Sequence, residues 1–112
     1  MKKAGEIRAV LVTAPNMRVA RQLAQGAVSS RVAACANVIA GVESHYWWNG
    51  KVEKSAEALI IFKTRAVRLG KLEKFVIENH PYDTPEFIAL KISGGNRSYL
   101  NWLTRETGEA AK

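Results

Sequence analysis

Residues 80–86 (HPYDTPE) concentrate the side chains that are best suited to chemistry. The segment holds an imidazole, a phenol and two carboxylates, together with two prolines. Prolines reduce the entropy lost when neighbouring groups are held in place, which suits a binding site and equally suits a plain helix-to-strand connection. His80 is the best titratable candidate, because imidazole is a common metal ligand and changes charge near neutral pH.

Cys35 and Lys63 are the other two candidates. Thiolate and imidazole ligands suit copper or zinc, so Cys35, His80 and Glu86 would form a metal site if the fold joined them. The alternative is that Cys35, which lies in the apolar run 32–39, is a small buried hydrophobe. Lys63 follows an apolar run, and we expect an anionic neighbour there, either Glu86 or a phosphate or carboxylate ligand.

Composition limits the compartment and the partners. A chain of 112 residues fits one domain, and its net charge of +7 makes anionic partners worth considering. One cysteine cannot form an internal disulfide, and no apolar stretch is long enough for a signal peptide or a membrane span. We therefore predict a cytoplasmic protein without membrane contact. The strands lack the aromatic pattern with which RNA-recognition motifs stack bases, which argues against nucleic acid.

The elements that must position these groups follow from apolar spacing. We expect strands over 7–13 and 87–92, helices over 17–28 and 65–79, a turn at 93–96 and a final helix around 99–103. A long hairpin fills the middle. The order β-α-β-β-α-β-α predicts an α+β fold: a ferredoxin-like split βαβ sandwich with a long central β-hairpin and an added C-terminal helix. The domain would cover 7–107, between tails at 1–6 and 108–112.

Asn49-Gly50, between two β-like stretches, predicts a two-residue hairpin turn. The resulting count predicts these pairs: Trp48 with Lys51, Trp47 with Val52, Tyr46 with Glu53, His45 with Lys54, Val42 with Glu57, and Cys35 with Thr64. A bulge near Gly41 would shift the lower pairs by one. Arms of about fifteen residues would each be roughly 50 Å long if straight, which is longer than a globule of this size.

The tip of this hairpin carries Tyr46, Trp47 and Trp48. Burying one tryptophan side chain of ~200 Å² is worth roughly 4–6 kcal/mol as an upper bound, and a projecting arm has no core of its own. We therefore expect another copy of the chain to cover the tip. The alternative is a curled hairpin that packs its tip on its own helices.

Several motifs occur together in a specific order: VTAP at 12–15, AACANVI at 33–39, YWWNGK at 46–51, KT at 63–64, HPY at 80–82, PE at 85–86 and YLNWL at 99–103. Over residues 7–105 the chain resembles the CutA family of divalent-cation tolerance proteins. The resemblance implies a ferredoxin-like subunit in a tight homotrimer, with hairpins that cross between subunits and an architecture similar to PII signalling proteins.

The resemblance also implies a function without a catalytic reaction: tolerance of divalent metal ions, copper especially. No cofactor is obligatory, although copper, another divalent cation or a small anionic ligand would bind between subunits. A PII-like regulator that binds an anionic metabolite and a partner protein is the alternative. The implied ligand-binding residues are Tyr46, Trp48, Lys63, Tyr82 and Glu86, and the implied metal ligands are Cys35 and His80. Val12 and Asn79 stand where some relatives carry a further cysteine or histidine, which argues against a strong copper site.

Overall fold

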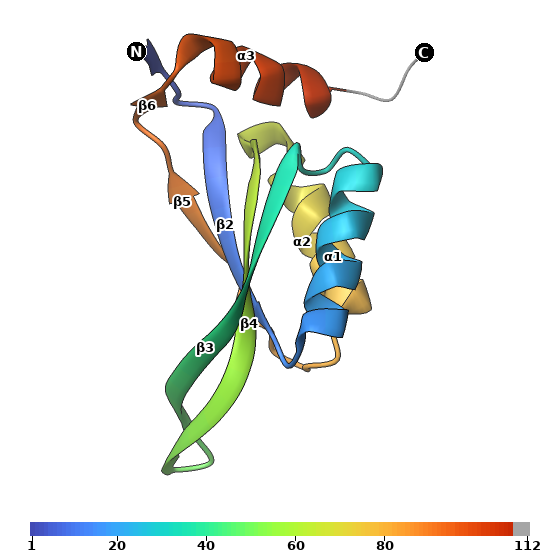
Figure 1. Ribbon diagram of the computed structural model, residues 1–112, viewed down its shortest axis with the longest axis vertical. Helices are drawn as coiled ribbons and strands as arrows, with labels where there is room; N and C mark the ends of the chain where they lie inside the picture. Colours follow the sequence, from blue (N-terminus) through green and yellow to red (C-terminus); the bar gives the residue numbers. More distant parts are fainter. Residues whose placement is uncertain (109–112) are drawn as a thin grey trace.

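The computed structural model describes residues 1–108, so the expected C-terminal tail lies outside the described part except for Gly108. Figure 1 shows the arrangement of the elements. In chain order they are β1 (Lys2–Lys3), β2 (Ile7–Ala14), α1 (Met17–Ser29), β3 (Cys35–Trp48), β4 (Lys51–Arg65), a 3₁₀ turn (Ala66–Arg68), α2 (Leu69–Asn79), β5 (Ile88–Lys91), β6 (Gly94–Gly95) and α3 (Arg97–Glu106).

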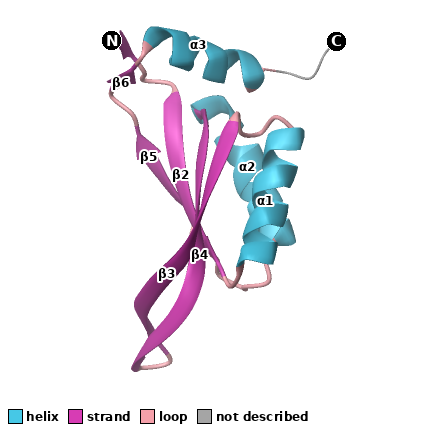
Figure 2. Cartoon of the chain, viewed as in Figure 1, coloured by secondary structure: helices cyan, strands magenta, loops and turns pink. Residues whose placement is uncertain are grey.

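The main sheet has four antiparallel strands in the order β3-β4-β2-β5. Helices α1 and α2 pack on one of its faces, and α3 crosses one end (Figures 1 and 2). Two βαβ-type halves that interleave in this way give the ferredoxin-like order, with α3 as the added helix. The predicted fold class is therefore confirmed.

The core lies between the sheet and helices α1 and α2. Because strand residues alternate between faces, every second residue of β2 and β4 points to the helices. Among these, Val10, Val12, Ile60 and Phe62 are fully buried. They pack with apolar residues of the helices, including Leu23, Ala27, Leu72 and Val76. We call this side of the sheet the covered face.

We call the opposite side of the sheet the open face: α3 covers only one end of it, where Ile7 packs with Leu100 and Leu103, and no other helix of residues 1–108 lies on it. Cross-strand register places Leu11 beside Ile61 and Ile88 on this face, and Ala9 beside Lys63 and Leu90. The side chain of Ile88 is 48% exposed, and Leu90 and Ile39 are exposed to a similar extent. A sheet face of this composition normally packs against another layer.

The central hairpin has the predicted turn and the predicted irregularity. Asn49 and Gly50 both have positive φ, 50° and 75°, as the favoured two-residue hairpin turn requires. All predicted pairs from Trp48–Lys51 to Val42–Glu57 are confirmed, and a bulge follows between Ile39 and Val42. The pairing below the bulge is shifted by one, so Cys35 faces Lys63 rather than Thr64.

The hairpin tip is not packed on the helices of its own chain. The outer parts of β3 and β4 extend past the ends of α1 and α2 (Figure 1), and the chain measures 45 Å along its longest axis. Trp47 is 74% exposed and its cross-strand partner Val52 is 62% exposed. The curled-hairpin alternative is therefore wrong for the single chain.

Helix boundaries depend on both local caps and distant contacts. Asn16 and Asn96 cap α1 and α3, because their Oδ1 atoms accept the backbone N–H of Val19 and Tyr99 at 2.9 and 3.0 Å. The helix predicted over 65–79 begins later, at Leu69. Arg65, the first residue of the predicted helix, instead belongs to β4, where it pairs with Ile7.

The segment around residues 93–96, expected as a turn, contains strand β6. Gly94 and Gly95 pair with Lys3 and Lys2 in a small second sheet. A Cβ on Gly94 would lie only 2.8 Å from the backbone oxygen of Lys2, so this approach requires glycine. The first residues of the chain are thereby tied to the connection between β5 and α3. The strand expected over 87–92 is shorter, at Ile88–Lys91.

Candidate functional site

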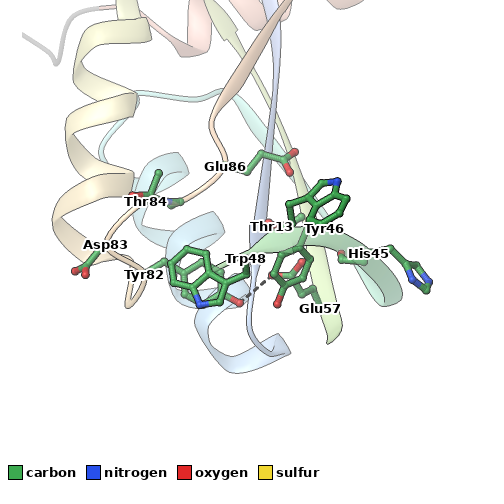
Figure 3. Close-up of a pocket in the computed structure, with 12 residues that line it drawn as sticks. Thr13, His45, Tyr46, Trp48, Glu57, Tyr82, Asp83, Thr84 and Glu86 are labelled. Atoms are coloured by element: carbon green, nitrogen blue, oxygen red, sulfur yellow. Dashed lines mark hydrogen bonds between the residues drawn. The ribbon is translucent and has the colours of Figure 1, made fainter. Parts of the chain in front are cut away.

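A pocket of about 750 Å³ lies between the outer part of β3 and the connection that follows α2. We call it the aromatic pocket, because its lining includes Tyr46, Trp47, Trp48 and Tyr82. Thr13 from β2 and Glu57 from β4 also line it. Figure 3 shows Tyr46, Trp48 and Tyr82 grouped around Glu57. The volume is in the range of small-molecule sites.

A hydrogen bond joins the hairpin to the 80–86 segment along one side of the pocket. The Tyr82 hydroxyl donates a hydrogen bond to Glu57 Oε2 at 2.8 Å. Tyr46 and Trp48 are two positions apart on β3, so they share one face of the hairpin, while Trp47 projects from the other. The turn register and the bulge next to Val42 therefore decide which aromatic rings face Glu57.

His80 positions the 80–86 segment from beneath. Its backbone is extended, as expected for a residue that precedes proline, and its side chain is only 9% exposed. Its Nε2 lies 2.7 Å from the carbonyl oxygen of Thr13, and its Nδ1 lies 3.1 Å from the backbone nitrogen of Tyr82. A carbonyl only accepts and an N–H only donates, so the ring is neutral with its proton on Nε2.

This arrangement assigns His80 a role different from the expected one. Both ring nitrogens are used within the chain, and the ring also packs against Tyr82 with centroids 4.7 Å apart. A metal ion would have to displace one of these bonds. In this conformation His80 holds Tyr82 in place rather than offering a free ligand atom.

The electrostatics of the aromatic pocket come from two carboxylates. Burial, and then the charge of Glu57, raise the pKa of the Glu86 carboxyl above its usual value. Burial, the hydrogen bond to Glu57 and the charges of Glu57 and Tyr46 raise the pKa of Tyr82 to about 12. Within residues 1–108, neither Glu57 nor Glu86 forms an ion pair. The pocket therefore favours positive charge.

A second polar group lies on the open face, near α3. Cys35 and Lys63 are cross-strand partners, and Asn37 Oδ1 accepts hydrogen bonds from Lys63 Nζ and, at 3.7 Å, from Cys35 Sγ. Burial, followed by the charge of Cys35 and a hydrogen bond to it, raises the pKa of Tyr99. We call Cys35, Asn37, Lys63 and Tyr99 the cysteine cluster.

The predicted site residues thus fall into two groups in one chain. Tyr46, Trp48, Tyr82 and Glu86 line the aromatic pocket, and His80 supports it. Lys63 lies six residues beyond Glu57 on β4, a separation of about 20 Å along the strand.

Two contacts expected from the sequence are therefore absent within the described chain. Lys63 does not meet Glu86 within this chain, because it bonds to Asn37. Cys35 does not meet His80 within this chain, since it faces Lys63 across the hairpin. Over residues 1–108, no three His, Cys, Asp or Glu side chains lie close enough together to hold a metal ion.

Glu57 and Asn37 are the residues that sequence reasoning missed. The predicted register already set Glu57 opposite Val42, so its place near the hairpin tip was available from the sequence. Its partnership with Tyr82 was not, because the two residues are 25 positions apart and come from different elements. Asn37 belongs to the same β3 run as Cys35, and its contact with Lys63 depends on the shift of register at the bulge.

Comparison with protein families and known sequences gives a consistent result. The family model of the CutA1 divalent ion tolerance protein matches residues 8–106. The chloroplastic protein CutA 1 of Oryza sativa is 50% identical over 101 residues, covering 90% of this chain and 57% of the rice protein. The divalent-cation tolerance protein CutA of Thermus thermophilus is 44% identical over 99 residues, covering 88% of this chain and 96% of that protein. This chain thus spans little more than half of the rice relative.

Solved structures agree with the sequence comparison. The crystal structure of CutA1 from Oryza sativa superposes with a TM-score of 0.91 at 46% identity, covering 96% of this chain and 98% of that one. The divalent cation tolerance protein from Thermus thermophilus superposes with a TM-score of 0.89 at 43% identity, covering 91% and 99%. The helices over residues 1–108 include none that is long and apolar enough to cross a membrane.

Proposed function

The chain belongs to the CutA1 divalent ion tolerance protein family, and on that premise we propose that it acts in tolerance of divalent metal ions as a non-enzymatic homotrimer. The family match over residues 8–106 is the observation that carries the proposal. That description names ion tolerance and no reaction. Because the chain spans only 57% of its rice relative, the proposal concerns this domain.

Assembly is supported by the apolar surface that one chain leaves uncovered. Ile39, Ile88 and Leu90 on the open face are each close to half exposed, although they sit in a regular sheet. Burying apolar surface contributes roughly 25 cal/mol per Å², so burial of these side chains against a second copy would stabilise the assembly.

The hairpin tip supplies a second uncovered surface, which is different from the first. Trp47 and Val52 project together from one side of the tip and are both mostly exposed. When two different surfaces of one chain meet in a head-to-tail manner, the copies form a ring if the rotation between them closes and a filament if it does not, rather than a twofold dimer. We therefore propose a ring, and we assign three copies from the resemblance to the family.

Metal binding in this assembly would use Cys35 as the thiol ligand for copper or another divalent cation. Cys35 lies on the open face and is partly exposed. Neighbouring copies that cover this face would bring their side chains toward the cysteine cluster. Those side chains would supply ligands that one chain lacks. His80 would contribute only if it released Thr13 or Tyr82. These conditions favour weak rather than tight binding.

The PII-like alternative is favoured by one observation at the cysteine cluster. The Lys63 ammonium group, among the described residues, bonds to the neutral Asn37 rather than to a carboxylate. A cation left without a counter-charge suits an anionic metabolite at a subunit boundary. Thermal shifts produced by nucleotides or organic acids, and lost in Lys63→Ala, would support this alternative; a flat response would remove it.

We propose that the protein is located in the cytoplasm, because its single cysteine suits a reducing compartment. Relatives differ in this respect, since the rice and Arabidopsis proteins are named as chloroplastic.

Calorimetric titration with Cu(I), Cu(II) and Zn(II) tests the metal proposal. We expect weak binding by the native protein that is lost in Cys35→Ser and reduced in His80→Ala. His45→Ala is the matched histidine control, because His45 is exposed and pairs with Glu43 at 2.8 Å. Identical binding by all four proteins would overturn the assignment of these ligands, and no binding by any of them would overturn direct metal binding.

A further inference from the structure

We propose that the aromatic pocket binds a small organic cation, with an alkylated ammonium group held between aromatic rings and the carboxylates of Glu57 and Glu86. This goes beyond the proposed function, because it concerns a different chemical class from a metal ion or an anion. It is also independent of the cysteine cluster, since the two sites share no residue.

The charge of the aromatic pocket is opposite to that of the chain. The whole sequence carries a net charge of +7, yet the lining holds Glu57, Asp83 and Glu86 and neither lysine nor arginine. His45, the one imidazole in the lining, pairs with Glu43 and points away from the other side chains (Figure 3). An anionic ligand would therefore meet like charge, and a cationic ligand would meet opposite charge.

The aromatic rings supply the second requirement. Tyr46 and Trp48 come from one face of β3, and Tyr82 comes from the connection that follows α2, so rings from two elements line the pocket. The face of an aromatic ring attracts a cation through its quadrupole, and quaternary ammonium groups are recognised by such cages. All three rings are partly exposed and accessible from the pocket.

The pocket is better suited to an organic cation than to a metal ion. Over residues 1–108, no three potential ligand side chains converge on one point. Glu57 already accepts the Tyr82 hydroxyl, which leaves it able to attract charge but not to complete a coordination shell. An ammonium group surrounded by methyl groups needs no such shell, because its charge is diffuse and its surface is apolar.

The state of Glu86 agrees with a missing counter-charge. This carboxyl is partly buried, lies in the field of Glu57 and forms no ion pair in the described chain. A cation placed between the two carboxylates would remove their mutual repulsion. The Tyr82–Glu57 bond keeps one wall in position before any ligand arrives, which reduces the ordering cost of binding.

Calorimetric titration with choline and with its neutral isostere 3,3-dimethylbutan-1-ol tests this inference. The two probes share size and shape and differ in charge. We expect choline to bind and the neutral alcohol to bind about tenfold more weakly, the ratio typical of a cation over aromatic rings. Equal binding of both probes, or no binding of choline, would overturn the inference.

Substitutions locate the binding to the pocket. Glu86→Gln removes a charge and keeps the shape, and Trp48→Leu removes a ring and keeps an apolar side chain; each is expected to weaken choline binding severalfold. Glu73→Gln on α2, outside the pocket lining, is the matched control and should bind like the native protein. Choline binding unchanged in both pocket variants would place the ligand elsewhere. Because metal titration is read separately, failure with choline leaves the metal proposal intact.

Discussion

The two faces of the central sheet are built from the same strands and differ in what covers them. On β4, Ile60 and Phe62 are fully buried under α1 and α2, while Ile61 between them points to the open face. On the open face, Ile88 and Leu90 remain about half exposed. The covered face is complete within one chain, and we propose that other copies of the chain cover the open face. Apolar residues on both sides of β4 are therefore typical of a strand whose second side would be covered in the proposed assembly.

Removing an apolar side chain from each face should separate the two kinds of stabilisation. Ile60→Ala is expected to lower the free energy of unfolding by about 2–5 kcal/mol, because it leaves a cavity in the core. Leu90→Ala is expected to have a smaller effect that grows when the protein is more dilute, since it acts through assembly. Urea unfolding at several protein concentrations measures both. If the loss of stability in Leu90→Ala does not depend on protein concentration, Leu90 does not act through assembly and the two faces do not differ in this way.

A charge on the open face should dissociate the assembly without unfolding the chain. Ile88→Lys places an ammonium group in the proposed interface, so sedimentation should shift to the mass of one chain while circular dichroism stays native. Ile77→Lys is the matched control, because Ile77 lies on α2 and is 50% exposed, close to the 48% of Ile88. If both variants sediment as the native protein does, the open face is not the interface.

The bulge at Gly41 connects the covered part of the hairpin to its projecting tip. Gly41 has φ +76° with open space around its Cβ position, so Gly41→Ala should cost about 1–2 kcal/mol from backbone strain alone. Gly70→Ala on α2 also has open space and no positive φ, and should instead gain about 0.5–1 kcal/mol. Thermal unfolding of the two variants gives the signs. A Gly41→Ala protein as stable as the native protein would mean that the bulge is not held in this conformation.

The smallest expected effect is a late tyrosine titration at the aromatic pocket. The folded-state pKa of Tyr82 is raised to about 12 from 10.0, so the folded chain holds this proton longer than the unfolded chain. The contribution of Tyr82 to stability is therefore present below pH 10 and is lost as the pH rises toward 12. Ultraviolet titration of the native protein should show a late step that is lost in Tyr82→Phe, in addition to the titration of Tyr99, whose pKa is also raised and which both proteins keep. Survival of that step in Tyr82→Phe would assign it to another tyrosine.

Local signals in the sequence predicted most of the fold. Asn49-Gly50 fixed the turn, and counting from it gave the strand pairs as far as Val42–Glu57. The bulge was expected because glycine tolerates positive φ, as Gly41 does. The helix start at Leu69 was not predictable, because Arg65 is held by Thr107, which is 42 residues away.

The candidate site was predictable in its residue types and not in its grouping. Tyr46, Trp48, Tyr82 and Glu86 line one pocket of the single chain, whereas Lys63 and Cys35 lie elsewhere in it. His80 became a supporting residue because the carbonyl oxygen of Thr13, 67 residues away, accepts a hydrogen bond from its Nε2–H. Contacts of this kind depend on how distant elements pack, which apolar spacing does not specify.

Above all, we propose that other copies of the chain cover the open face. Sedimentation velocity of the native protein at micromolar concentration tests it most directly. We expect a single species with the mass of three chains, which persists on dilution through that range. A stable, folded species with the mass of one chain would contradict it.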